Sequence, residues 1–291
     1  MNKFKKITVL MLAFVLSMTI LGGCSTAGND SKSNTNSGES ETLKKIKERG
    51  YIVVAGTGTA PFGFIDVDTK QYKGVDAEIT TAIAKKLGIN KVQFVQATFN
   101  SLLLELKNGN CDVVSSAMYI TKERQKAALF SNVYYKEGEA ILFSQDAGFK
   151  SLKDFKNATI AVQQGSGFVK VAEEYVKEGY MKNIQTYPSI NDALLALSSK
   201  KVDAVMVDNV AIAYKLSQDK SIKAKMLSPY EMKYSGMIGA ALPLDDKKFA
   251  SEWNKALDEL KEDGTVMKIL KKYGLTEEYF VGVKEGQTVN P

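Results

Sequence analysis

The sequence predicts an α/β protein made of two lobes of similar design. Segments typical of strands alternate with segments typical of helices along most of the chain. The 291 residues exceed the commonest size of a single domain but suit two lobes of ordinary size. In addition, residues 106–114 and 197–205 share a pattern: a Leu, an Asp six positions later, and then an apolar strand. Two similar lobes would produce this repeat, and chance similarity between two βα units is the alternative.

The expected elements follow from hydrophobic periodicity and from turn and cap residues. Apolar runs bounded by turn residues predict strands at residues 51–55, 92–95, 111–119, 141–143, 159–162, 204–207 and 237–242. Amphipathic runs with cap signals predict helices at residues 43–49, 75–87, 101–107, 121–128, 168–177, 210–216, 249–262 and 264–273, and another helix after a Ser189 cap. Trp253 lies in one of these amphipathic helices and is expected in the core. Because strands and helices alternate, we expect mainly parallel sheets.

The first 23 residues have the parts of an export signal. Three lysines at positions 3, 5 and 6 precede an apolar run at residues 7–20, which is too short for an ordinary transmembrane helix. Leu-Gly-Gly-Cys at residues 21–24 then resembles the lipobox of bacterial lipoproteins. We therefore expect cleavage before Cys24 and a lipid of the diacylglycerol and palmitate type on its thiol. An ordinary signal peptide that ends near a cysteine is the alternative.

Residues 24–42 are expected to form a flexible tether, since Ser, Asn, Gly, Thr and charged residues dominate there. Removal of residues 1–23 takes away three lysines and no acid, so the formal net charge falls from +6 to +3. Half of the positive net charge thus belongs to the predicted targeting signal. Nothing in the sequence interleaves Lys/Arg with aromatics in the way that predicts nucleic-acid binding, and we expect no nucleic-acid partner.

Cysteine and histidine usage excludes several chemistries. Cys111 is the second of two cysteines and lies in an apolar run, so we expect a buried core residue rather than a disulfide or a reactive thiol. The sequence has no His, which excludes Ser-His-Asp and Cys-His catalysis and His-rich zinc sites. A carboxylate-only metal site stays open, but no calcium-loop spacing occurs. We expect no metal and no cofactor.

An anion site is predicted where residues 120–124 follow an apolar strand. Thr121 is a plausible N-cap, which places Arg124 in the first helical turn. Cations usually avoid that end of a helix because the helix dipole is positive there. An Arg in this place suggests an anion held by the guanidinium together with free backbone N–H groups. The alternative is a solvated Arg124 that pairs with Glu123 or Asp112.

Two glycine-containing loops follow strands. Residues 56–64 contain three glycines as well as Phe62 and Phe64, which offer apolar surface. Residues 163–167, Gln-Gln-Gly-Ser-Gly, lie between a predicted strand and a predicted helix, a geometry that presents backbone N–H groups to an anion. The second loop lacks the dinucleotide fingerprint, and no Walker lysine follows it.

Taken in order, these motifs resemble the polar-amino-acid family of extracellular solute-binding proteins that feed bacterial ABC importers. The resemblance covers about residues 43–275. The motifs that carry it are Ala60-Pro61-Phe62, Gly74-Val75-Asp76, residues 112–124, Phe130-Ser131 with Tyr134-Tyr135, residues 162–167, residues 202–208 and residues 262–265.

The resemblance implies a two-lobed, periplasmic-binding-protein-like fold of type II with two crossing hinge strands. Lobe 1 would comprise residues 43–133 and 239–291, and lobe 2 residues 139–233. The hinges would lie at residues 134–138 and 234–238. The ligand of such a fold sits in the cleft between the lobes.

The resemblance also implies roles for individual residues. Arg124 would clamp the α-carboxylate of an amino acid, and the N–H of Ser166 would reach the same group. Asp208 would accept the α-ammonium with help from the backbone near Ser116, and Phe99 would pack against the ligand side chain. Arg124 and Asp208 each follow a strand, which is where α/β folds bind ligands.

Some positions depart from the family pattern. Family members often carry an Asp where this chain has Gly56 and an aromatic where it has Thr59, and Tyr119 replaces a usual Ser or Thr. A missing acid disfavours a Lys- or Arg-type ligand, so a neutral polar or small amino acid is favoured. The other expected contacts are Gln163, Gln164 and Gly165.

We therefore expect a monomeric binding protein rather than an enzyme. It would be lipid-anchored through Cys24 on the extracellular face of the bacterial cytoplasmic membrane and would deliver an amino acid to an ABC permease and ATPase. One alternative is an exported enzyme of the same fold, such as a cyclic-acid dehydratase, which would need a proton-transfer residue in the cleft. The other is an adhesin or sensor built on the same module.

Overall fold

The computed structural model describes residues 38–291. The predicted signal peptide, Cys24 and the tether up to residue 37 lie outside these residues. No helix among residues 38–291 is long and apolar enough to cross a bilayer.

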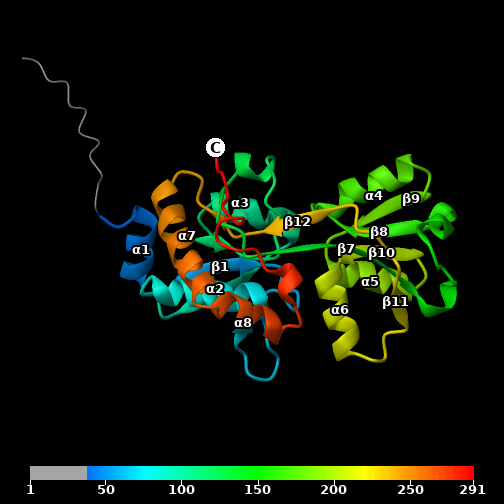
Figure 1. Cartoon of the computed structure of the whole chain (residues 1–291), viewed down its shortest axis with the longest axis horizontal. Coiled ribbons are helices and arrows are strands. Elements are labelled where there is room, and N and C mark those ends of the chain that lie inside the picture. Colours follow the sequence, from blue (N-terminus) through cyan, green and yellow to red (C-terminus); the bar gives the residue numbers. More distant parts are fainter. Residues whose placement is uncertain (1–37) are drawn as a thin grey trace, which may run out of the picture. The chain divides into compact units, whose positions relative to one another are not determined.

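One sheet has five strands in the order β4-β1-β5-β13-β6 (Figure 1). The strand β1 is parallel to β4 and β5, while β13 is antiparallel to β5 and β6. The strands are β1 (Ile52–Gly56), β4 (Val92–Gln96), β5 (Val113–Val114), β6 (Leu129–Phe130) and β13 (Ala241–Leu242). The helices of this lobe are α1 (Glu41–Arg49), α2 (Val75–Lys86), α3 (Leu102–Lys107), α7 (Lys247–Glu262) and α8 (Thr265–Lys272). A small hairpin of β2 (Phe64–Ile65) and β3 (Tyr72–Lys73) precedes α2.

A second sheet has the order β11-β7-β10-β8-β9, with β12 also paired to β7. Its strands are β7 (Tyr135–Ser144), β8 (Thr159–Gln163), β9 (Asn183–Tyr187), β10 (Ala204–Asp208), β11 (Ala224–Met226) and β12 (Ser235–Ile238). Its helices are α4 (Phe168–Lys177), α5 (Ile190–Ser198) and α6 (Asn209–Gln218). In Figure 1, the first half of β7 and the antiparallel β12 run side by side between the two sheets. The chain thus has the predicted two-lobed α/β fold.

The sheets are mixed, so the prediction of mainly parallel sheets is wrong. Each sheet has a parallel centre, β4-β1-β5 in one and β9-β8-β10 in the other. The antiparallel strands come from the long β7 and from the returning chain after β12. The single strand expected at residues 237–242 is two strands, because β12 pairs with β7 whereas β13 pairs with β5 and β6.

The helix expected at residues 121–128 is a short 3₁₀ helix, Arg124–Lys126. Glu123, and not Thr121 as expected, is the N-cap residue, although the Thr121 Oγ1 does accept the N–H of Arg124 at 3.2 Å. The chain then enters β6 at Leu129 and joins the sheet there.

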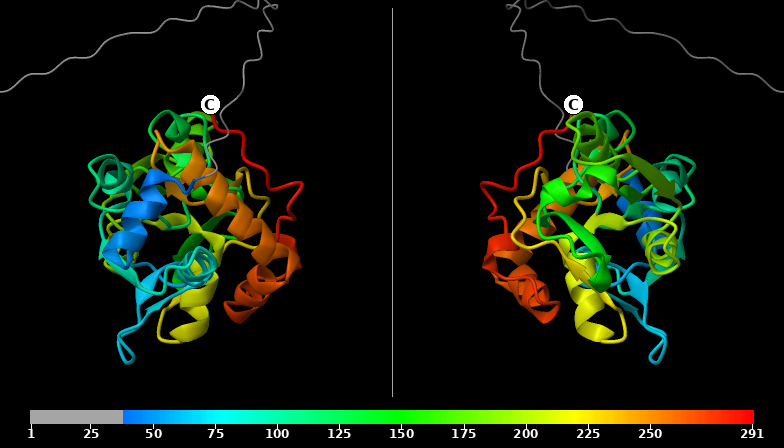
Figure 2. Two further views of the ribbon diagram at one scale, coloured as in Figure 1. Left: turned by 90° about the vertical axis from the view of Figure 1, so that its left-hand side faces the viewer. Right: turned by 90° about the vertical axis from the view of Figure 1, so that its right-hand side faces the viewer.

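The core of the first lobe forms around α7. Trp253 is fully buried, as expected, and its indole Nε1 donates to the hydroxyl of Tyr134 at 3.1 Å. In Figure 2, α1 and α7 lie side by side, and Ser40 at the start of α1 binds Glu252 of α7 through Oγ at 2.5 Å. Cys111 is buried, which confirms the core prediction, and burial raises the pKa of its thiol to about 12.

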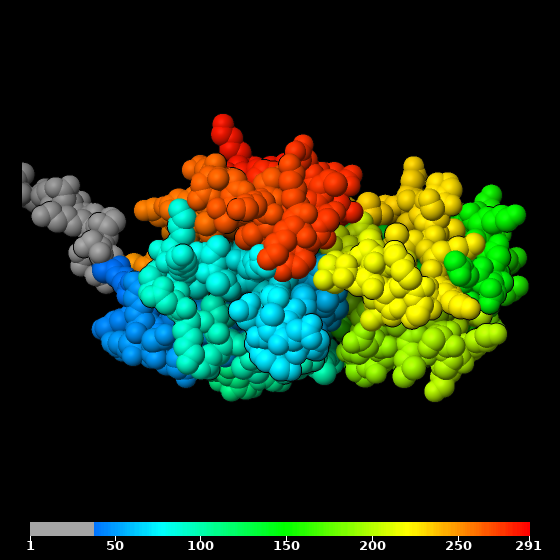
Figure 3. Space-filling view, turned by 90° about the horizontal axis from the view of Figure 1, so that it is seen from below, coloured from blue at the N-terminus to red at the C-terminus, as the bar shows by residue number. Residues whose placement is uncertain are grey.

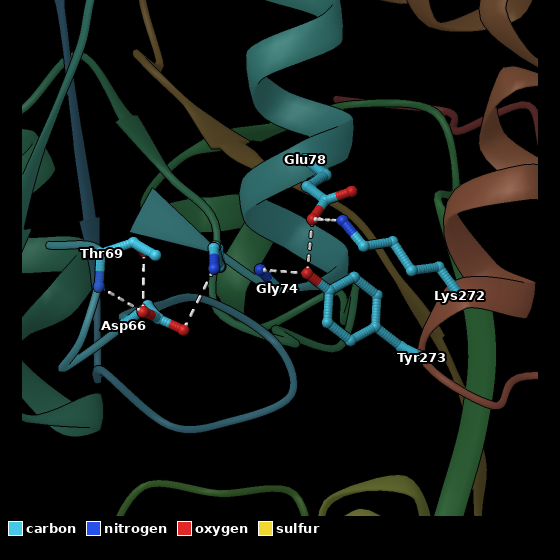
Figure 4. Close-up of polar contacts among 7 residues, drawn as sticks. Asp66, Thr69, Gly74, Glu78, Lys272 and Tyr273 are labelled. Atoms are coloured by element: carbon cyan, nitrogen blue, oxygen red, sulfur yellow. Dashed lines mark hydrogen bonds and ion pairs between the residues drawn. The ribbon is translucent and has the colours of Figure 1, made fainter. Parts of the chain in front are cut away.

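A polar cluster ties the C-terminal helix α8 to the start of α2 (Figure 4). The hydroxyl of Tyr273, which follows α8, accepts the N–H of Gly74 at 2.9 Å and donates to Glu78. Lys272 pairs with the same carboxylate at 2.6 Å. Beside this cluster, the centroid of the Tyr273 ring is 6.5 Å from that of Tyr214 in α6. Figure 3 shows the orange-red C-terminal segment next to the yellow segment of the second lobe.

Tyr273→Phe is expected to lower the free energy of unfolding by about 1 kcal/mol, because the change leaves Gly74 and Glu78 without their shared partner. Chemical denaturation measures the change. Tyr180→Phe is a matched control, since the structure gives the Tyr180 hydroxyl no hydrogen bond within residues 38–291. Equal losses of unfolding free energy in the two variants would show that the hydrogen bonds of the Tyr273 hydroxyl contribute nothing to stability.

Candidate functional site

The carboxyl ends of six strands surround one small cavity of about 20 Å³. Loops after β1, β4 and β5 approach it from the first sheet, and those after β8, β9 and β10 approach it from the second. This is the position where parallel α/β sheets place ligands, since the strand ends leave a crevice between loops. The lining residues are Thr57, Thr59, Phe62, Phe99, Ser116, Ala117, Tyr119, Arg124, Gln163, Ser166, Gly167, Phe168, Ile190 and Asp208.

The guanidinium of Arg124 is held by backbone carbonyls from both sheets' loops. Its Nη1 donates to the Tyr119 carbonyl at 2.8 Å, and its Nη2 donates to the Gly165 carbonyl at 3.0 Å. Its Cζ lies 5.2 Å from the centroid of the Phe99 ring. Burial lowers the pKa of Arg124, which reflects the cost of keeping the cation out of water.

The alternative in which Arg124 pairs with a neighbouring acid is wrong. Glu123 pairs instead with Lys126 at 2.6 Å, on the exposed surface, and Asp112 pairs with Arg49. Within residues 38–291 no carboxylate forms an ion pair with Arg124. The guanidinium therefore has the charge, and the position in the cavity lining, that an anion would need.

The turn before α4 brings Ser166 to the cavity but uses its N–H internally. That N–H donates to the Gln163 carbonyl at 3.2 Å, and α4 begins two residues later at Phe168. The Ser166 Oγ, in contrast, is buried and has no partner within residues 38–291. Gly165 has φ +77°, and a Cβ there would lie 3.0 Å from Asn100 of the other sheet's loop. This close approach requires a glycine.

Asp208 lies at the end of β10 and is 9% exposed. Burial raises the pKa of its carboxyl group. Within residues 38–291 no Lys or Arg forms an ion pair with it. A buried carboxylate at a strand end, without its own cation, is suited to accept a positive group from outside.

Small hydroxyl side chains line the cavity beside the end of β1. Thr57 donates its N–H to Ser116 Oγ at 3.1 Å, and its own hydroxyl lies 2.9 Å from that of Thr59. These hydroxyls hold the loops after β1 and β5 together. They also offer neutral polar groups to the cavity.

Tyr119 places a bulky ring between the two sheets, at a position where the sequence resemblance expected a small residue. Its ring packs edge-on against Phe168 at 5.5 Å and against Tyr234 at 5.1 Å between centroids. A Cβ on Gly236 would collide with this ring, so a glycine in β12 makes the packing possible. The Tyr119 hydroxyl is buried without a partner, and burial raises its pKa.

Asp76 of α2 holds the loop after β5 in place. Its carboxylate accepts the N–H of Ala117 and, at 2.8 Å, the hydroxyl of Tyr135. Ala117 lines the cavity with φ +47°, a conformation that a residue with a Cβ rarely adopts. The two hydrogen bonds oppose the effect of burial, which raises the pKa of Asp76 to about 6.

The folded protein is expected to gain stability as pH falls from 7.5 to 5. A carboxyl whose pKa is about 6 when folded and near 3.8 when unfolded binds its proton first in the folded state. The stabilisation is lost as pH rises through about 6, and its full value of about 3 kcal/mol is reached only below the unfolded pKa. Between pH 7.5 and 5 it amounts to about 1.4 kcal/mol. Denaturant unfolding at both pH values measures it. Asp76→Asn should reduce the difference, and an unchanged pH dependence in that variant would contradict this assignment.

Of the predicted site residues, eight line the cavity together: Thr59, Phe99, Ser116, Tyr119, Arg124, Gln163, Ser166 and Asp208. Gly165 contributes its carbonyl to Arg124, whereas Gln164 is exposed and does not line the cavity. Their roles in binding stay predictions. The residues that were missed include Phe168 and Ile190, which open α4 and α5. The sequence did offer a signal for both: Phe168 directly follows the glycine turn, and Ile190 directly follows the Ser189 cap.

The chain matches a family model over residues 51–276, described as bacterial extracellular solute-binding proteins, family 3. The chain belongs to this family. This confirms the resemblance drawn from the motifs. Loops from both sheets line the cavity.

Individual relatives agree with this assignment along most of their length. The arginine-binding extracellular protein ArtP of Bacillus subtilis is 28% identical over 88% of this chain and 96% of its own. The L-cystine-binding protein TcyA of the same organism is 30% identical over 92% of this chain and 97% of its own. A solved structure of an ancestral arginine-binding protein bound to arginine is 32% identical, with a TM-score of 0.70 over 78% of this chain and 99% of its own. These relatives are named for binding and not for catalysis.

Proposed function

We propose that this protein captures an amino acid outside the cell and delivers it to an ABC importer. The observation that carries the proposal is the pair of opposite charges on one cavity: Arg124 from the first lobe and Asp208 from the second. An amino acid carries a carboxylate and an ammonium group on the same α-carbon, and these charges are complementary to those of Arg124 and Asp208. Relatives that are named for binding arginine and cystine, both amino acids, support the same class of ligand.

In the proposed complex, the ligand carboxylate takes the place of the Tyr119 and Gly165 carbonyls at Arg124. The free hydroxyl of Ser166 donates to the same carboxylate. Asp208 accepts the ammonium beside Ser116, and the ligand side chain packs on Phe99. A few charge-assisted bonds of about 1.5–3 kcal/mol each suffice for micromolar affinity.

The ligand is proposed to be a neutral polar or small amino acid. Apart from Asp208, the residues that line the cavity include no carboxylate that could receive a second cationic group. Thr57, Thr59 and Gln163 instead offer neutral hydrogen-bonding groups. The bulky ring of Tyr119, which packs against Phe168 and Tyr234 beside the cavity, favours a compact side chain. The arginine-binding relatives make arginine the main competitor in the test below.

Closure around the ligand is proposed to occur by hinge motion at residues 134–138 and 234–238, between lobes with the predicted boundaries. The antiparallel pairing of β7 and β12 supports hinges there. Ligand contact with both lobes is required, since only differential contact with the closed form drives closure. A lipid anchor on Cys24 and a monomeric state complete the proposal. Loss of membrane association in Cys24→Ala would support the anchor.

A thermal-shift screen of the twenty amino acids, cystine and small amines tests the proposed function. At 100 times its dissociation constant, a true ligand should stabilise the protein by about 2.7 kcal/mol. The largest shift is expected from a neutral polar or small amino acid. A largest shift from arginine would overturn the ligand preference alone, and no shift from any amino acid would overturn the proposed function.

A further inference from the structure

A second buried carboxyl group lies on the same sheet face as Asp208, on the adjacent strand. Glu137, in the first half of β7, is 2% exposed. Neither carboxylate oxygen receives an N–H or hydroxyl donor within residues 38–291. The carboxyl of Asp208 belongs to the neighbouring strand, and interaction between the two carboxyl groups contributes to the pKa shift of each. Two ionised carboxylates have no hydrogen to share, so a hydrogen bond between them requires a proton on one.

The position of Glu137 follows from strand register. Asp208 in β10 pairs with Glu139 of β7, and Glu137 lies two residues earlier on the same face of β7. Glu139 is satisfied by the hydroxyl of Tyr230 at 2.9 Å and by the N–H of Lys233 at 2.6 Å. Glu137 has no comparable donors, so the two acids are in different chemical environments although they share a strand.

The surroundings of the Glu137–Asp208 pair hold little positive charge to compensate a second anion. Opposite Glu137, β12 contributes Gly236, which has no charge. Among the residues that line the cavity, the cation is Arg124, whose guanidinium is bound to backbone carbonyls. The titratable groups that interact electrostatically with the pair are Asp76 of α2, Tyr119 after β5, Tyr135 of β7 and Tyr279 near the C-terminus, and Glu139 of β7 lies opposite Asp208 in the sheet.

We propose that Glu137 remains protonated and donates a hydrogen bond to Asp208, and thereby keeps Asp208 ionised as the acceptor for the ligand ammonium. Glu137 is thus a positioning residue that acts through Asp208. The role in binding rests on the proposed function, whereas the sharing of the proton does not. The pair carries a single negative charge, which matches a single ammonium group, because two buried carboxylates in contact cannot both ionise.

The pKa values of the two groups agree with this arrangement. Burial, followed by the nearby Asp208, raises the pKa of Glu137 well above its usual range. Burial also raises the pKa of Asp208, but the hydrogen bond from Glu137 opposes that rise. Removal of the donor should therefore let the pKa of Asp208 rise further.

Carbon-13 NMR titration of the side-chain carboxyl carbons of the chain, with no amino acid added, tests the inference independently of the proposed function. In the unmodified protein, the Glu137 carbon should have the chemical shift of a protonated acid at pH 7. Glu137→Gln keeps an N–H donor, so the midpoint of Asp208 should stay within about half a pH unit. Glu137→Met keeps the volume but removes the donor, so the midpoint should rise by about one unit or more, a tenfold change in proton affinity.

Glu123→Gln, which removes an exposed acid from the surface, serves as the control and should leave the midpoint unchanged. Equal midpoints in the Gln and Met variants would overturn the role of the hydrogen bond. An ionised Glu137 at pH 7 would overturn the shared proton. That second readout needs no substitution, so it decides the matter even if Glu137→Met fails to fold.

Discussion

Arg124→Ala is expected to weaken binding of the amino acid that gives the largest thermal shift by at least about 100-fold. In the proposed complex, the guanidinium forms two charge-assisted hydrogen bonds with the ligand carboxylate, each worth about 1.5–3 kcal/mol. Asp208 and the neutral hydroxyls of the cavity cannot replace a cation. Isothermal titration calorimetry measures the change in the dissociation constant.

Two further variants separate charge from geometry in this experiment. Arg124→Lys keeps the charge but not the planar fork, so its affinity should fall between those of the unmodified protein and the Ala variant. Lys126→Ala removes a nearby cation that pairs with Glu123 on the exposed surface, and it should bind as the unmodified protein does. Unchanged affinity in Arg124→Ala, with the fold intact by thermal unfolding, would refute the assigned anion site.

Asp208→Asn is expected to weaken binding of the same amino acid by about 10- to 100-fold at pH 7.5. The substitution keeps the shape of the side chain but removes the charge that accepts the ammonium, a loss of about 1.5–3 kcal/mol. The pH profile should change as well. Because burial raises the pKa of Asp208, the unmodified protein should lose affinity as pH falls through that raised pKa, whereas the Asn variant should show little dependence.

Asp146→Asn is the matched control for this variant, since Asp146 is an exposed acid in the same lobe. It should leave both the affinity and its pH dependence unchanged. If Asp208→Asn retained full affinity, the ammonium would have to bind elsewhere. If it lost affinity but kept the pH profile of the unmodified protein, another group would be the one that titrates.

Local signals in the sequence were sufficient where a strand or helix has its own apolar pattern and its own cap. Ser189 caps α5 through the N–H of Asp192, and α4 spans Phe168–Lys177, both as predicted. The strand β9 was missed because it lies at the sheet edge with mostly exposed polar residues and no apolar alternation. The antiparallel strands β6 and β13 were missed or merged because two residues give too little pattern.

The candidate site shows the same division between local and tertiary information. Arg124 and Asp208 could be placed at one cavity because each follows a strand, and strand ends meet at one edge. Glu137 could not be found in this way. In the sequence it lies between Lys136 and Gly138 in a charged stretch typical of a solvated strand, and its burial results from the pairing of β7 with β10 and β12.

The most direct test of the central claim is a crystal structure with the amino acid that stabilises the protein most. We expect the ligand carboxylate within hydrogen-bonding distance of both Nη atoms of Arg124, in place of the Tyr119 and Gly165 carbonyls, and the ammonium on the carboxylate of Asp208. A complex in which Arg124 keeps both carbonyls, or in which Asp208 faces no part of the bound molecule, would contradict the account.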